Sequence, residues 1–148
     1  MIIRERMVYD MVASDSYYRG EAVKTNALLQ VSEESKEAVR DLFMGALDDV
    51  VVMMNCFFGE CVQQTSEVDG FLVVELKAKA PALWIAGLTS ELNGCIHEYL
   101  ADVVAVRWLE KFGVSVAGKG VERKLRLLMN RRRMPMPEDY RDIKIIEV

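Results

Sequence analysis

The stretch WIAGLTSELNGCIHEYLADVVAVRWLEKF, residues 84–112, decides the fold class of this chain. Pro81 suits the first turn of a helix, so we expect a helix over residues 82–112, roughly 45 Å long at about 1.5 Å per residue. Glu98 and Asp102 fall on one narrow stripe of this helix, and the rest of its circumference is largely apolar. A helix that is apolar on most sides needs several neighbours, so this stretch predicts the central helix of a helical domain.

The residues before this segment predict a second long helix. Ser32 is a suitable N-cap, and the apolar residues after it recur at spacings of three or four up to about Gln63. The other expected elements are a helix over 4–13 with Met7, Val8, Met11 and Val12 inward, a turn over 14–20, a loop over 21–31, and a basic helix over 120–133 with Val121, Leu125 and Leu128 inward.

One short segment predicts β structure. Residues 68–70, Val-Asp-Gly, are a turn signal, and residues 71–76 after them are β-branched in the middle, which is typical of a strand. A strand needs a hydrogen-bonding partner. Residues 143–148 are the other convincing strand-like run, and they could pair with residues 71–76 within one chain or between neighbouring chains.

These elements predict a mainly α fold, an up-and-down bundle of about four helices with a small two-stranded β addition. Residues 1–148 are expected to form a single helical domain, with residues 134–148 as a C-terminal tail or strand. The chain is 51% hydrophobic and 28% charged, which is ordinary for a soluble folded protein. Because charged residues occupy 4–6 and no charge-free run approaches about 18 residues, we expect neither a signal peptide nor a membrane span, and a cytoplasmic protein.

Charge is distributed unevenly along the sequence. Residues 111–133 carry a formal charge of +7, whereas residues 1–110 carry −9. Arginine side chains bind phosphates and carboxylates, so the basic segment could contact nucleic acid or an acidic surface of a neighbouring copy. The alternative is a solvated helix face whose cations stabilise the helix dipole. The candidate contacts are Arg123, Lys124, Arg131, Arg132 and Arg133.

No recognisable catalytic set accompanies these features. His97 is the single histidine, and its place on the apolar central helix favours a core or interface role over acid–base catalysis. Glu91, Glu98 and Asp102 share one stripe and could hold a cation, but the spacings of EF-hand and di-iron sites are absent. We therefore expect no enzyme, no catalytic residues, no metal and no cofactor.

Two further motifs favour ordinary structural roles. The three cysteines, Cys56, Cys61 and Cys95, indicate buried free thiols, because their number is odd and no CxxC motif occurs. Residues 117–120, Ala-Gly-Lys-Gly, lack the pattern of a phosphate-binding loop, so a turn between helices is expected there.

Several short patterns along the chain are similar to those of a known group of proteins. They are residues 96–102 (IHEYLAD), 106–109 (VRWL) and 131–135 (RRRMP), with 8–13 (VYDMVA) and 16–20 (SYYRG) near the N-terminus. Together they resemble small prophage proteins from gut Bacteroidetes that look like phage head–tail connector or neck proteins. The resemblance implies an oligomeric structural role at the junction of portal and tail, without catalysis.

Our first hypothesis is therefore a non-enzymatic structural and assembly protein of a prophage, head–tail connector-like, that acts through oligomerisation. Its expected partners are further copies of itself and phage portal or tail proteins, with non-specific DNA contact as a further option and no membrane. It would reside in the cytoplasm or in a virion. The alternative is a nucleic-acid-binding or regulatory helical module that uses residues 119–133. An enzyme centred on His97 and Glu98 is the third hypothesis.

Overall fold

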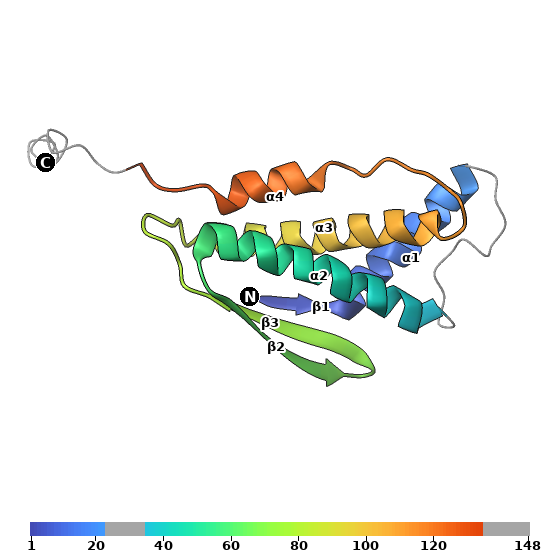
Figure 1. Cartoon of the computed structure of the whole chain (residues 1–148), viewed down its shortest axis with the longest axis horizontal. Coiled ribbons are helices and arrows are strands. Elements are labelled where there is room, and N and C mark those ends of the chain that lie inside the picture. Colours follow the sequence, from blue (N-terminus) through green and yellow to red (C-terminus); the bar gives the residue numbers. More distant parts are fainter. Residues whose placement is uncertain (23–34, 135–148) are drawn as a thin grey trace, which may run out of the picture.

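The computed structural model describes residues 1–22 and 35–134 (Figure 1). Its elements follow the order β1 (Ile2–Arg4), α1 (Glu5–Ala22), α2 (Lys36–Phe58), β2 (Cys61–Val68), β3 (Phe71–Ala78), α3 (Leu88–Glu110) and α4 (Val121–Met129). The prediction of a mainly α fold with a β addition is confirmed, but the sheet has three antiparallel strands rather than two.

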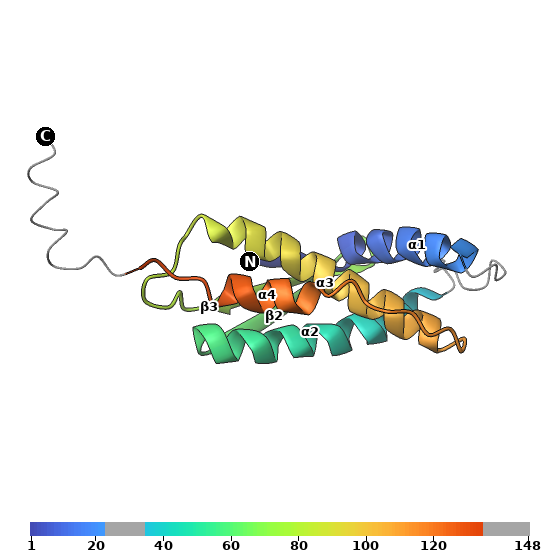
Figure 2. The ribbon, with the colours of Figure 1, turned by 90° about the horizontal axis from the view of Figure 1, so that it is seen from above.

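The elements are stacked in layers, with the sheet on one side, α1, α2 and α3 over it, and α4 on the far side (Figures 1 and 2). Helix α3 packs against the three other helices and against β1, so the predicted central helix is confirmed. It begins at Leu88 rather than at residue 82. The segment after Pro81 forms turns instead, in which Leu83 adopts a positive φ of 64°.

The sheet has the order β1-β3-β2. The predicted turn at Asp69 and Gly70 and the predicted strand after it are confirmed, since β3 pairs with β2 along its whole length. The predicted extension of α2 to Gln63 is wrong, because Gly59 takes a positive φ of 78° and the chain then enters β2. The proposed partner strand, residues 143–148, lies outside the described residues.

Helix α1 differs from the prediction at both ends. It begins at Glu5 and continues to Ala22, so the predicted turn over 14–20 is wrong. Val8 and Val12 are buried as predicted, whereas Met7 is exposed and Met11 is only half-buried. The buried face therefore follows residues 5, 8, 9 and 12.

The other helix ends also shift. Helix α2 begins at Lys36 with Ser35 at the N-cap position, and the predicted N-cap Ser32 and residues 23–31 of the predicted loop lie outside the described residues. Helix α4 ends at Met129 rather than at Arg133. Its predicted inward residues Leu125 and Leu128 are buried, and Val121 is half-buried. None of the helices described for this chain combines the length and the hydropathy that a membrane span requires.

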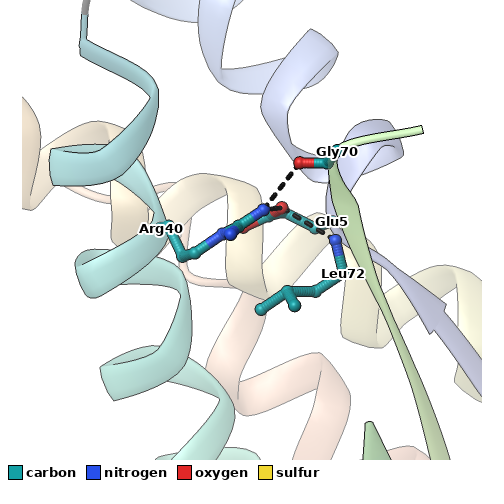
Figure 3. A network of polar contacts seen from close by, with 4 residues as sticks. All are labelled: Glu5, Arg40, Gly70 and Leu72. Carbon is teal, nitrogen blue, oxygen red and sulfur yellow. Dashed lines mark hydrogen bonds and ion pairs between the residues drawn. The ribbon is translucent and has the colours of Figure 1, made fainter. Parts of the chain in front are cut away.

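A buried carboxylate fixes the hairpin of β2 and β3 to the helices (Figure 3). Glu5 is 3% exposed and accepts hydrogen bonds from Nε and Nη2 of Arg40, at 2.9 and 2.8 Å, and from the N–H of Leu72 at 2.9 Å. Arg40 Nη2 also donates to the carbonyl oxygen of Gly70 at 2.7 Å. Hydrogen bonding to Glu5 raises the pKa of the Arg40 guanidinium, although burial opposes this. The network joins α1, α2 and the hairpin turn at one point.

Candidate functional site

The exposed face of α4 carries part of the predicted basic surface. Its opposite face packs on the core through Leu125, Leu128 and Met129, so the charged residues between them point outward. Arg123, Lys124 and Arg131 line one groove beside α3, together with Glu91, Gly120, Leu127 and Leu128. We call these seven residues the basic groove.

The basic groove is only partly free to bind an anion. Lys124 Nζ lies 3.6 Å from the Glu98 carboxylate, and Glu91 adds a second negative charge at the groove wall. Two of the three acids of the predicted stripe, Glu91 and Glu98, thus lie beside basic residues of α4. Leu127, 64% exposed, adds an apolar side chain to the lining of the groove beside its cations.

Arg132, the middle residue of the arginine triplet, is turned into the structure. Its Nη1 donates to the carbonyl oxygens of Met129 at 2.6 Å and Arg131 at 2.8 Å, and its Nη2 donates to that of Phe57 at 3.1 Å. The guanidinium also lies 5.7 Å from the ring centre of Phe58 and 5.3 Å from that of Trp84. Arg132 therefore joins the ends of α2 and α4 through these bonds, and its role as a partner contact stays a prediction.

Arg133 is separated from the basic groove. Its N–H donates to the carbonyl oxygen of Leu83 at 2.7 Å, and its side chain is exposed. The five predicted contact residues therefore divide into three groups. Arg123, Lys124 and Arg131 share a groove, Arg132 is structural, and Arg133 is held by its main chain at the start of the C-terminal segment.

His97 is buried, as the sequence predicted for a core histidine, and both its ring nitrogens have partners. Nδ1 lies 2.8 Å from the carbonyl oxygen of Asn93, and Nε2 accepts the N–H of Arg4 at 3.1 Å. Because a carbonyl can only accept, Nδ1 carries the proton and the ring is neutral. Burial lowers the pKa of His97, and the hydrogen bond to Asn93 opposes this shift. The imidazole therefore provides the acceptor for a main-chain N–H at the outer edge of β1.

Asp102 holds the loop of residues 117–120, for which the sequence predicted a turn between helices. Its Oδ2 accepts the N–H of Lys119 at 2.9 Å, and the Lys119 ammonium lies 3.3 Å from the Asp15 carboxylate. A Cβ on Gly118 would lie 3.0 Å from the same Oδ2, so a larger residue there would require the Asp102 carboxylate to shift. This lysine is engaged by an acid, which favours the predicted turn over a phosphate site.

A second groove lies between α2, α3 and the start of α4. It is lined by charges that neutralise one another, since Arg107 pairs with Asp49 at 3.2 Å and Arg126 pairs with Glu122 at 3.0 Å. Within residues 1–22 and 35–134, no three histidine, cysteine or carboxylate side chains gather closely enough to hold a metal ion.

The three cysteines are free thiols, as predicted, but only Cys95 is buried. Burial raises the pKa of the Cys95 thiol and also that of the half-buried Cys61. Both shifts disfavour the reactive thiolate.

Strand β2 is a surface that the sequence prediction missed. All of its residues after Cys61 are exposed, including Val62 at 60% and Val68 at 54%. It forms the outer edge of the sheet, on the side of β3 opposite to β1 (Figure 1). The Asp69-Gly70 turn could have indicated β2 from the sequence. Such dipeptides join two antiparallel strands, so they imply a strand before the turn as well as after it.

No family model, no curated protein and no solved structure matches this chain.

Proposed function

We propose that the chain is a non-enzymatic assembly protein of a prophage, similar to head–tail connectors, that acts through oligomerisation. The single observation that carries the assembly part is the outer edge of β2, which pairs with no other strand among the residues that the structure describes. A long exposed edge strand presents unpaired main-chain groups and readily accepts another chain. The assignment to a prophage connector is supported by the sequence resemblance of residues 96–102, 106–109 and 131–135 and of two short patterns near the N-terminus.

The chemistry of the candidate catalytic residues also favours an assembly role. His97 uses both ring nitrogens on main-chain groups, so neither is available to a substrate while the structure is intact. Asp102 accepts a main-chain N–H, and Glu98 faces Lys124. These residues therefore have structural partners that account for their positions.

The experiment that tests oligomerisation is light scattering on the full chain during size-exclusion chromatography, from low to high micromolar concentration. We expect a mass that is a multiple of the 16.8 kDa chain. A monomer at every concentration and at low salt would contradict self-assembly. The genes on either side test the prophage assignment independently, because portal, terminase and capsid genes are expected there.

A second candidate function is nucleic-acid binding by the basic groove. The observation that favours it is the meeting of Arg123, Lys124 and Arg131 at one surface. No aromatic residue is among those that line this groove, so stacking of single-stranded bases is not supported there. Binding would depend on phosphate contacts and would weaken steeply with salt.

A further inference from the structure

The two edges of the sheet differ in the hydrogen-bond partners of their outer main-chain groups. At the β1 edge, side chains of α3 form hydrogen bonds with the outer main-chain groups of the strand. Asn93 Nδ2 donates to the carbonyl oxygen of Ile2 at 2.9 Å, and His97 Nε2 accepts the N–H of Arg4 at 3.1 Å. At the β2 edge, the N–H of Cys61 donates to Asn55 Oδ1 at 2.7 Å. Past Cys61, no described group bonds to the outer edge of this strand.

The register shows which main-chain groups are open. Leu76 of β3 exchanges hydrogen bonds with Met1, at 2.8 and 3.0 Å, so its N–H and C=O both point toward β1. Gln63 is opposite Leu76 and therefore directs its own groups away from β3. By the alternation of an antiparallel ladder, Thr65 and Glu67 do the same. The open edge thus consists of the main-chain groups of Gln63, Thr65 and Glu67.

Strand β2 lacks the features that usually keep an edge strand from pairing. It is eight residues long, contains neither proline nor lysine, and has Glu67 as its one charged residue. Both of its faces are exposed, so neither a helix nor a loop of the described chain covers it. Edge strands of soluble proteins are normally short, charged, bulged or covered.

We infer that β2 of one copy pairs in antiparallel fashion with β2 of a second copy, about a two-fold axis at Thr65. The two three-stranded sheets then join into one continuous sheet, held by about six main-chain hydrogen bonds between the copies. This inference rests on the proposed function, because both require self-association, and it names the surface that is used. The contact is isologous, so it forms a closed pair that can act as the unit of a larger assembly.

Two requirements restrict the register, and an axis at Thr65 is the one that also pairs all three open residues with one another. Outward groups of one strand must meet outward groups of the other, and the N–H of Cys61 is excluded because Asn55 occupies it. An axis at Thr65 meets both, since it places Gln63 opposite Glu67 of the second copy and Thr65 opposite itself. An axis at Glu67 would bring two like charges face to face, which is unfavourable.

The side chains also fit this register. Val62 of each copy lies opposite Val68 of the other, so the two large exposed apolar residues of β2 cover one another. Gln64 lies opposite Ser66 on the same face of the sheet. Paired β-branched residues in neighbouring strands stabilise a sheet, and here the pairing also removes apolar surface from water.

The test compares Thr65→Pro with Thr65→Val in the full chain by light scattering. Thr65→Pro removes an N–H of the open edge and leaves the bonds between β2 and β3 intact, whereas Thr65→Val keeps that N–H. We expect Thr65→Val to retain the mass of the unaltered protein and Thr65→Pro to halve it, with both variants folded by circular dichroism. Equal masses for the two variants would overturn the inference.

A cross-linking experiment covers the case in which Thr65→Pro fails to fold. In a Cys56→Ser, Cys61→Ser background, the chains Gln64→Cys and Ser66→Cys are mixed and oxidised. Non-hydrogen-bonded neighbours in antiparallel strands have Cα atoms about 4.5 Å apart, within disulfide range. We expect a disulfide between the two different chains, and its absence overturns the inference. An oligomer without this disulfide leaves the assembly function standing, whereas a monomeric unaltered protein removes both.

Discussion

Arg132 donates a hydrogen bond from Nη2 to the carbonyl oxygen of Phe57 at 3.1 Å, across 75 residues of sequence. The same guanidinium reaches the end of α4 through Met129. It also lies over Trp84, whose ring meets that of Phe58 edge-on with centres 5.0 Å apart. One side chain therefore joins the ends of α2 and α4 to the segment before α3.

The first prediction separates Arg132 from its neighbours in the triplet. Arg132→Ala should lower the free energy of unfolding by about 1.5–3 kcal/mol, because it leaves helix-end carbonyls without their charged donor and removes the contact with Trp84. Urea unfolding measures this change. Arg133→Ala is the matched control and should stay within about 0.5 kcal/mol of the unaltered chain. Equal effects of the two substitutions would show that Arg132 does not hold the helix ends.

The second prediction concerns Glu5. Glu5→Gln should cost about 2–4 kcal/mol, since it leaves the partly buried Arg40 without its carboxylate partner. Glu60→Gln, at an exposed glutamate, should change the unfolding free energy by less than about 0.5 kcal/mol. Urea unfolding measures both. Hydrogen exchange at the main chain of Leu72 should also speed up, because its N–H donates to Glu5. Unchanged exchange would mean that another group fixes the hairpin.

The third prediction concerns pH. Burial lowers the pKa of His97 from its ordinary value of 6.5, so the folded chain binds this proton less readily than the unfolded chain. The contribution of neutral His97 to the free energy of unfolding is complete above pH 6.5. As the pH falls below that value, the free energy of unfolding decreases by at most about 1.4 kcal/mol per pH unit. Unfolding at pH 7.5 and 5.5 should show a larger loss for the unaltered chain than for His97→Gln, which cannot titrate. Parallel losses would contradict the buried neutral imidazole.

The sequence predicts the apolar interior better than the element ends. The spacing of Leu92, Ile96, Leu100 and Val104 identified α3 as central, because a helix buried on several sides leaves an unmistakable composition. Its start was missed because residues 81–87 are held by a tertiary contact, the bridge between Trp84 and Arg132, which no local pattern encodes.

Strand β2 was missed for a different physical reason. The apolar spacing of α2 continues through Phe58, and the residues of β2 that follow show no alternation of polar and apolar types. Alternation arises when one face of a strand is buried, and both faces of β2 are exposed. Similarly, three consecutive arginines look alike in sequence, and only tertiary contacts such as the hydrogen bond to Phe57 and the packing on Trp84 distinguish Arg132.

The fourth prediction tests the basic groove. If the groove contacts DNA phosphates, Arg123→Ala and Arg131→Ala should each reduce the slope of log binding constant against log salt by about one unit. Arg126→Ala is the control, because Arg126 pairs with Glu122 on its own helix and lies outside this groove. Fluorescence anisotropy with duplex DNA at several salt concentrations measures the slopes. Equal slopes for all three variants, or no binding, would exclude the groove as a nucleic-acid site.

The last prediction concerns Trp108, which is 6% exposed near the end of α3 and meets Phe112 edge-on with ring centres 5.2 Å apart. Trp108→Ala should cost about 3–5 kcal/mol, a large share of the stability of an ordinary domain, because it removes a large buried side chain and leaves a cavity. Phe112→Ala provides the control, since Phe112 is 46% exposed and its loss opens no enclosed space. Thermal and urea unfolding should give Trp108→Ala a clearly lower melting temperature and free energy of unfolding than Phe112→Ala. A Trp108→Ala protein that melts within about two degrees of the unaltered chain would mean that Trp108 does not anchor the end of α3, since a loss of even 1 kcal/mol lowers the melting temperature of a domain of this size by more than that.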